Sequence, residues 1–200
     1  MGNNFNFKEH ILYIIEKPTK NINFFSRVSV HLTQWSKITV YNTLIMPHLL
    51  FSASILYLAN KNEINGLQIL QNRVMRIILK EKRDTSIGSM LERLKWLPTE
   101  KFLKSQVRIL IYKIKNGPNY FSDKLVTGEA IHSYPTRSNR TNISNRSKNK
   151  FYVSTKNKKS SENMIYHKGL ISFNSLPIDI KNSQNLRIFK IKLREYILRE

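Results

Sequence analysis

Basic residues at helical spacing are the first feature of this sequence that could do chemistry. The stretch LQILQNRVMRIILKEKR, residues 67–83, places lysines and arginines beside a regular series of apolar residues. Lysine and arginine side chains bind phosphate groups through charge and hydrogen bonds, without reading a base sequence. The candidate phosphate contacts in this stretch are Arg73, Arg76, Lys80, Lys82 and Arg83.

A second basic segment lies farther along the chain. Between residues 130 and 161 there are eight lysines and arginines and no acidic residue. Tyr134, Phe151 and Tyr152 lie among them and could stack on unpaired bases. A soluble tail or a localisation signal is the alternative interpretation of such a segment. Its candidate phosphate contacts are Arg137, Arg140, Arg146 and Lys148.

The whole chain shares this excess of positive charge. Its 200 residues include 34 lysines and arginines against 13 aspartates and glutamates, which gives a formal net charge of +21. Because such a charge repels itself unless an anionic partner offsets it, nucleic acid is the leading candidate partner and an acidic membrane surface the second. We expect no small-molecule substrate.

Cysteine usage and the N-terminus bear on the compartment. The chain has no cysteine, which excludes disulfides, thiolate metal sites and cysteine nucleophiles. The first residues, MGNNFNFKEH, lack the basic region followed by an apolar core that a secretory signal needs. We therefore expect an intracellular protein, in the nucleus or the cytoplasm.

Groups that catalyse reactions or bind metals are sparse. The chain has three aspartates, and no two of its acidic residues are adjacent, so no carboxylate pair for a two-metal site is visible. The five histidines lack the spacing of metal ligands, and the six glycines form no phosphate-binding loop. We expect no catalytic residue, no metal and no cofactor in this chain.

Apolar residues recur at three- and four-residue steps through most of residues 5–117, which predicts a series of α-helices. We expect a helix over residues 5–16 that Pro18 ends, a second over residues 21–32, and a third from about Ser36 that Pro47 kinks or divides. The fourth contains the basic stretch, with Asn62 as its N-cap.

On that fourth helix the apolar side chains should face a core, whereas Arg73, Arg76 and Lys80 should line a neighbouring face. A short helix should follow Asp84. Pro98 should open a further helix to about residue 115. Residues 1–117 are therefore expected to form a helical bundle.

The rest of the chain predicts two further parts. Residues 118–163 should be a basic, flexible and partly disordered linker, because they offer little apolar area to offset the entropy of ordering. Within it, FYVST at residues 151–155 alternates as a short strand does. Residues 164–200 should form a C-terminal helical unit, with helices near 164–175 and 186–199. The expected fold class is mainly α.

One uncharged span, residues 38–60, is long enough to cross a hydrocarbon core of roughly 30 Å. Polar residues and Pro47 within the span oppose insertion, and basic residues on both flanks give no orientation preference. From composition alone, a buried helix and a membrane attachment both stay open.

Several short motifs resemble those of reverse transcriptases of non-LTR retrotransposons, of the jockey-like and RTE-like kind. The similar stretches cover nearly the whole chain in the family's order. They are FNFKEHI at 5–11, YNTLIMPH at 41–48, LQILQNRVMRII at 67–78, HSYPTR at 132–137, KGL at 168–170 and NSLP at 174–177.

The resemblance implies a thumb-like helical bundle followed by a basic C-terminal region. In this family a palm domain before this region carries the metal-binding aspartates, including a Tyr/Phe-x-Asp-Asp motif that does not occur in these 200 residues. The divalent metal would therefore belong to the missing palm, and an endonuclease domain would be missing as well. For the span 38–60 the resemblance implies a buried thumb helix.

Together these observations predict a non-catalytic fragment of an RNA-directed DNA polymerase that binds RNA or an RNA/DNA hybrid through its basic helix and loop. Three alternatives stay open. One is an inert, partly folded pseudogene product. Another is a membrane-attached basic protein that uses residues 38–60. The third is a functional polymerase that borrows a palm from another chain.

Overall fold

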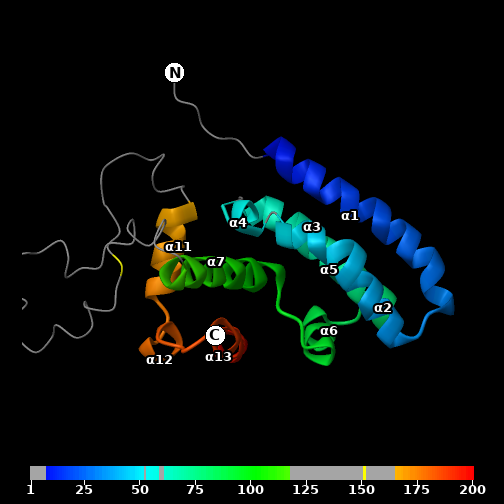
Figure 1. Cartoon of the computed structure of the whole chain (residues 1–200). Helices are drawn as coiled ribbons and strands as arrows, with labels where there is room; N and C mark the ends of the chain where they lie inside the picture. Colours follow the sequence, from blue (N-terminus) through cyan, green and yellow to red (C-terminus); the bar gives the residue numbers. More distant parts are fainter. Residues whose placement is uncertain (1–7, 52, 59–60, 118–150, 152–164) are drawn as a thin grey trace, which may run out of the picture. The chain divides into compact units, whose positions relative to one another are not determined.

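The computed structural model of this chain describes residues 8–51, 53–58, 61–117, 151 and 165–200 (Figure 1). The described residues are mainly α-helical, so the predicted fold class is confirmed. The chain divides into two compact units, residues 1–106 (unit 1) and 107–200 (unit 2). This division falls inside α7 (Thr99–Asn116), whereas the sequence placed the end of the first part after that helix.

Two long helices of unit 1, α1 (Lys8–Val28) and α5 (Lys61–Leu79), lie side by side and run in the same direction. Near their beginnings, a Cβ added at Gly66 of α5 would lie 3.2 Å from Ile15 of α1. Two turns later, Arg73 of α5 donates a hydrogen bond to Asn23 of α1. The two helices therefore end at the same end of unit 1.

The chain between these two helices returns in the opposite direction as a series of short helical segments. It consists of α2 (Gln34–Val40), a π-helical turn η2 (Tyr41–Ile45), α3 (Met46–Phe51) and α4 (Ala53–Leu56). The division predicted at Pro47 is not seen, because the helical backbone continues from α2 through η2 into α3, with helical φ and ψ at Val40, Tyr41 and Met46. The π-helical turn ends directly before Pro47, so it is the hydrogen-bond pattern of the helix that changes there.

The prediction that Pro18 ends the first helix is wrong, because α1 continues through Pro18 to Val28. The separate helix expected over residues 21–32 is the second half of α1. Ile14, Ile22 and Phe25 are buried along one stripe that spans the proline. Each such side chain stabilises the fold by about 1.5–3 kcal/mol, and together they outweigh the roughly 3 kcal/mol that an interior proline costs.

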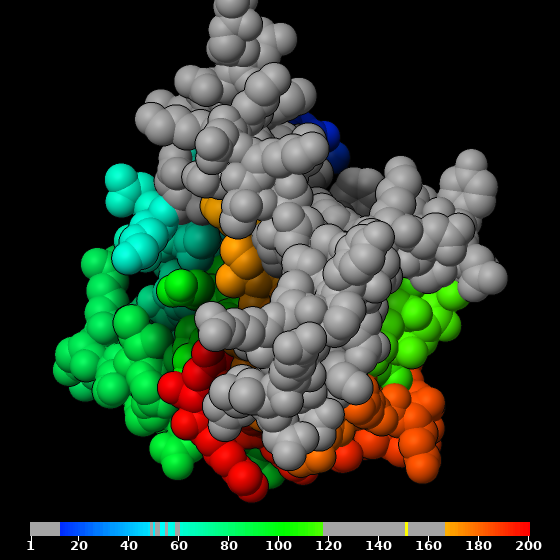
Figure 2. All heavy atoms as spheres, turned by 90° about the vertical axis from the view of Figure 1, so that its left-hand side faces the viewer, coloured from blue at the N-terminus to red at the C-terminus, as the bar shows by residue number. Residues whose placement is uncertain are grey.

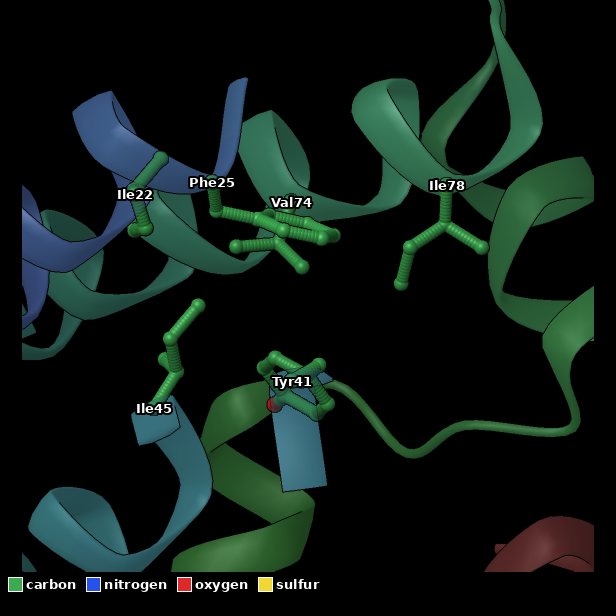
Figure 3. Packing of buried hydrophobic residues seen from close by; sticks show 6 residues of the cluster. All are labelled: Ile22, Phe25, Tyr41, Ile45, Val74 and Ile78. Atoms are coloured by element: carbon green, nitrogen blue, oxygen red, sulfur yellow. The ribbon is translucent and has the colours of Figure 1, made fainter. Parts of the chain in front are cut away.

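The core of unit 1 lies where the three helical segments meet (Figure 3). A first cluster of buried side chains contains Ile22 and Phe25 from α1, Tyr41 and Ile45 from η2, and Val74 and Ile78 from α5. The aromatic ring of Tyr41 also stacks on Trp96, with ring centroids 4.3 Å apart. A second cluster lies toward the other end of the same helices and includes Ala53, Leu56 and Leu103.

These clusters bury several apolar side chains of the uncharged span 38–60, as expected for a core helix. Within the described part of the chain, no helix is both long enough and apolar enough to cross a membrane.

Unit 2 contains the second half of α7, α11 (Ile165–Asn174), α12 (Ile178–Lys181) and α13 (Leu186–Arg199). Helices α11 and α13 match the two helices predicted near the C-terminus. α11 approaches α7 closely at Gly169, where an added Cβ would lie 3.0 Å from Val107. The rings of Tyr112, Phe173 and Phe189 stack in the core of this unit. The outer side chains of α13 (red in Figure 2) reach the surface.

Most of the predicted linker and strand lies outside the described residues. The exception is Phe151, whose side chain is buried against Phe173. Its backbone N–H donates to Oδ1 of Asn174 at 3.0 Å, and its carbonyl oxygen accepts from Nδ2 of the same residue at 2.8 Å. One residue of the run FYVST is thus held by a side-chain amide.

Candidate nucleic-acid interface

Arg73 lies on the side of α5 that borders α1. Its Nη2 atom donates to Oδ1 of Asn23 at 2.8 Å, and the residue is exposed. A guanidinium group carries five N–H donors in a planar fork. The hydrogen bond to Asn23 therefore orients Arg73 at the surface and leaves it donors for an anionic ligand.

Arg76, one turn farther along α5, is half-buried and binds the chain that follows the helix. Its Nε donates to the carbonyl oxygen of Lys82 at 3.3 Å and its Nη2 to that of Arg83 at 3.1 Å. Arg76 therefore shapes the loop between α5 and α6 (Ile87–Leu94). Its predicted phosphate contact stays a prediction, and the structure gives this residue a structural task.

Lys80 does not lie on the helix face where the sequence placed it, because α5 ends at Leu79. Lys80 has a positive φ of 57°, and the N–H of Glu81 donates to the carbonyl oxygen of Arg76 at 3.1 Å. This hydrogen bond closes the last turn in the manner of a Schellman motif. At the other end, α5 begins at Lys61, so Asn62 lies in the first turn and is not the N-cap.

The loop after α5 exposes Lys80, Lys82 and Arg83. The carboxylate of Glu81, in the same loop, accepts hydrogen bonds from Arg93 and Thr85. Those two bonds lower the pKa of Glu81, so this acid stays ionised and paired. Asp84, the other acidic residue of the loop, is exposed and offsets one of its three cations. The exposed charge of the loop is therefore positive.

A buried cation lies beneath this loop. Lys37 of α2 is 2% exposed, and its Nζ donates to the carbonyl oxygen of Ile77 in the last turn of α5 at 3.2 Å. Burial, and then repulsion by Lys80, lower the pKa of Lys37. Helix C-termini leave carbonyl groups without partners, and Lys37 satisfies one of them.

The packing of α1 against α5 adds a cation that the sequence analysis did not select. Arg27 is exposed one turn beyond Asn23 on α1, so it lies beside the last turns of α5. Arg27 could not be selected from the sequence, because its place beside α5 depends on the parallel packing of the two helices. We call the exposed cations at this end of unit 1 the basic end: Arg27, Arg73, Lys80, Lys82 and Arg83.

The second predicted contact group, Arg137, Arg140, Arg146 and Lys148, lies outside the described residues. The same holds for Tyr134 and Tyr152. The structure therefore tests only the part of the predicted interface that lies on α5 and the loop after it. Among described residues, no group of histidines, aspartates and glutamates could hold a metal ion.

Polar residues of the stretch LQILQNR have structural partners. Oε1 of Gln68 accepts from the backbone N–H of Thr99 at 2.8 Å, and Oε1 of Gln71 accepts from its hydroxyl at 3.0 Å. Nε2 of Gln71 donates to the carbonyl oxygen of Leu97 at 2.9 Å. These two glutamines therefore tie α5 to the segment that leads into α7.

Several cations of unit 2 also bind backbone carbonyls. Nζ of Lys181 donates to the last carbonyl of α11, at Asn174, over 2.8 Å. Nζ of Lys115 donates to the carbonyl oxygen of Lys181 at 3.2 Å, and burial lowers its pKa. Arg108 is fully buried and donates to the carbonyl oxygen of Ser172. A part of the positive charge thus stabilises the fold itself.

No protein-family model, curated protein or solved structure matches this chain. The resemblance to reverse transcriptases therefore rests on the residues named above.

Proposed function

We propose that this chain is a thumb-like, nucleic-acid-holding part of an RNA-directed DNA polymerase of the non-LTR retrotransposon kind. In this proposal the basic end of unit 1 binds the phosphates of RNA or of an RNA/DNA hybrid. Nucleotide addition would depend on palm aspartates that this chain does not supply. The chain alone would hold a template and not copy it.

The observation that carries the proposal is the gathering of exposed cations at one end of unit 1. α1 contributes Arg27, α5 contributes Arg73, and the loop after α5 contributes three more. In that loop the carboxylate of Glu81 is already paired with Arg93. Phosphate groups are the ligands that such a surface attracts, and each phosphate contact releases condensed counterions.

The hydrogen bonds of the other cations strengthen this argument. Lys37 and Arg76 donate hydrogen bonds to backbone carbonyl oxygens, so these two cations stabilise the fold. Lys80, Lys82 and Arg83 are exposed beside them. Burial, and then the charge of Lys80, lower the pKa of Lys37. An anionic partner would relieve the repulsion between these charges.

The test is a titration of the full chain with a fluorescently labelled RNA/DNA hybrid, followed by anisotropy at increasing salt. We expect tight binding at about 50 mM salt and a steep linear fall of log K with log salt. The triple variant Lys80→Glu, Lys82→Glu, Arg83→Glu should bind much more weakly, with a salt slope smaller by about 2–3.

The matched control is Arg187→Glu, Lys190→Glu, Arg199→Glu, which changes the net charge equally at exposed positions of α13. This control should bind nearly as well as the unmodified chain. Failure of the unmodified chain to bind at about 50 mM salt would overturn the proposal, since the electrostatic contribution is strong in that range. Equal losses in both triple variants would overturn the assignment to the basic end.

A further inference from the structure

The side chain of Asn174, the last residue of α11, holds one residue of the chain by both of its backbone groups. Its Oδ1 atom accepts a hydrogen bond from the N–H of Phe151 at 3.0 Å, and its Nδ2 atom donates to the carbonyl oxygen of the same residue at 2.8 Å. Two such bonds to a single residue are what a neighbouring strand makes at a hydrogen-bonded pair of an antiparallel sheet. The amide of Asn174 therefore binds an extended backbone as the edge of a sheet does.

The ring of Phe151 packs beside this amide. Phe151 is 9% exposed, and its ring centroid lies 5.8 Å from that of Phe173, at an interplanar angle of 41°. This distance is typical of aromatic pairs that attract each other. The ring contact and the backbone contact thus come from two consecutive residues of α11, Phe173 and Asn174. Together they fit an extended chain that carries an aromatic side chain.

Contacts other than those with Phe151 fix both of these α11 residues. The carbonyl oxygen of Asn174 accepts a hydrogen bond from Nζ of Lys181 in α12 at 2.8 Å. Phe173 is fully buried, and its ring stacks on that of Phe189 in α13. The helices of unit 2 therefore hold the amide and the ring in place by their own contacts. A site that is held in advance loses less conformational entropy when it binds a ligand.

The residues around Phe151 have the same sign of charge as the site. Lys148 and Lys150 precede Phe151, and no acidic residue lies within ten residues on either side of it. On the site, the cation of Lys181 is bound to the carbonyl oxygen of Asn174. Like charges on a site and on its ligand weaken binding. The ring and the backbone of Phe151 fit the site, whereas the charge of its neighbours does not.

We infer that Phe173 and Asn174 form a binding site for an extended peptide of another protein, in which an aromatic residue takes the place of Phe151 and acidic residues flank it. Peptides that add to a sheet edge bind in this way, because main-chain hydrogen bonds supply affinity and a side-chain contact supplies specificity. Acidic flanks would remove the repulsion that Lys148 and Lys150 cause. This inference does not depend on the proposed function.

The experiment measures the binding of a fluorescently labelled peptide, SKNKFYVST (residues 147–155), to the full chain by anisotropy. In the unmodified chain Phe151 competes with the peptide at an effective concentration that is about millimolar for a tethered ligand. Phe151→Ala in the chain vacates the site of the ring, so this variant should bind the peptide at least about tenfold more tightly. A peptide that itself carries Phe151→Ala should bind to that variant about 100-fold more weakly.

A second substitution in the Phe151→Ala chain tests the amide. Asn174→Asp keeps the size of the side chain and the acceptor for the N–H, but it places a second acceptor against the carbonyl oxygen of the peptide. The affinity should fall about 5- to 150-fold. The matched control is Asn182→Asp, which makes the same change at an exposed residue of unit 2 whose Oδ1 accepts from Lys115. This control should bind the peptide as the Phe151→Ala chain does.

The charge of the partner is tested with a peptide that carries Lys148→Glu and Lys150→Glu. It should bind about 2- to 5-fold more tightly than the original peptide at low salt. This advantage should vanish at about 1 M salt, where exposed charges are screened. The same acidic peptide with Phe151→Ala should bind weakly, which separates the site from a general attraction to a chain of net charge +21.

Absence of peptide binding to the Phe151→Ala chain at about 1 mM peptide would overturn the inference, because the contact would then be structural only. If this variant melts at a lower temperature by circular dichroism, the peptide should raise its Tm, since a ligand of the folded state stabilises it. A Tm that the peptide leaves unchanged would overturn the inference equally. Equal affinities of the acidic and the original peptide at low salt would overturn the choice of an acidic partner.

Discussion

The Nζ atom of Lys37 donates a hydrogen bond to the carbonyl oxygen of Ile77 at 3.2 Å, forty residues along the chain. This bond joins α2 to the last turn of α5 with a cation that is 2% exposed. Burial, then the charge of Lys80, lower the pKa of Lys37 below its usual 10.5. The unfolded chain therefore holds this proton more tightly than the folded chain does.

From this relationship we predict a pH dependence of stability. Between the lowered pKa and 10.5 the unfolded state binds more protons, so the free energy of unfolding contributed by Lys37 rises with pH in that window. Lys37→Met should lose this rise. The measurement is urea unfolding followed by tryptophan fluorescence, which reports unit 1 because both tryptophans lie there. If the free energies of unfolding of the unmodified protein and of Lys37→Met differed by a constant amount up to pH 10.5, the prediction would be contradicted.

Because of Tyr41, we predict that the free energy of unfolding falls with pH at higher pH. Burial raises its pKa from 10.0 to about 12. Because the unfolded tyrosine ionises first, stability should be full below pH 10.0 and should fall as the pH rises toward 12, by roughly 2–3 kcal/mol in total. Tyr41→Phe keeps the stacked ring and loses only the hydroxyl contact with Met46.

The Tyr41→Phe variant should lie within about 1 kcal/mol of the unmodified protein at neutral pH. Above pH 10.0 its stability should fall less, as measured by the same fluorescence. Tyr112→Phe serves as the comparison, because burial also raises the pKa of Tyr112 but this residue lies in unit 2. Identical alkaline losses in Tyr41→Phe and the unmodified protein would show that Tyr41 is not responsible.

We predict that substitution of Arg108 destabilises unit 2 strongly. Its guanidinium is fully buried and donates to the carbonyl and hydroxyl oxygens of Ser172, to the hydroxyl of Ser175 and to Glu200. Arg108→Met removes these hydrogen bonds from a buried site and should lower the free energy of unfolding by about 2–4 kcal/mol. Arg187→Met, at an exposed position, should stay within about 0.5 kcal/mol. Urea unfolding followed by circular dichroism measures both, and equal stabilities would refute the prediction.

A substitution at Lys80 should change the stability of the protein and its binding of nucleic acid in opposite directions. Its φ of 57° is a conformation that glycine adopts without cost, so Lys80→Gly should raise the free energy of unfolding by about 0.5–1 kcal/mol. The same change removes a cation from the basic end and should reduce the salt slope of nucleic-acid binding by about 0.7–0.9.

Lys82→Gly is the matched control for Lys80→Gly, because it removes the same charge two residues away at a residue without positive φ. It should reduce the salt slope equally and should not stabilise the protein. Equal stability changes in the two variants would refute the role of backbone conformation at Lys80. Unchanged salt slopes in both would remove these lysines from the proposed interface.

Much of the helical architecture could be predicted from the apolar periodicity. The helices containing residues 67–79, 99–116 and 186–199 have apolar stripes that are continuous and capped or ended by polar residues, proline or glycine. The prediction that Pro18 ends a helix is wrong because it considers only the backbone cost of proline and not the burial of apolar side chains on both sides of it. The burial of Ile14, Ile22 and Phe25 on one helix was visible only after α5 and η2 were in place.

The candidate site was predictable in part. The charges of Arg73, Lys80, Lys82 and Arg83 could be read directly from the sequence, and these residues are exposed. Arg76 could not be assigned to the loop carbonyls, because the loop geometry depends on where α5 ends. The exposure of Trp35 could not be predicted, because a tryptophan is highly buried on average.

The sequence by itself determined a mainly α-helical chain with a large excess of positive charge, because periodicity and charge are properties of the residues in order. The tertiary structure decided which cations bind carbonyls and which face solvent. The basic residues of α5 became an interface candidate, and Lys37 and Arg108 became core residues, because exposure depends on neighbours that are distant in the chain. The same reason placed Arg27 at the basic end, because only the parallel packing of α1 and α5 brings it beside the last turns of α5.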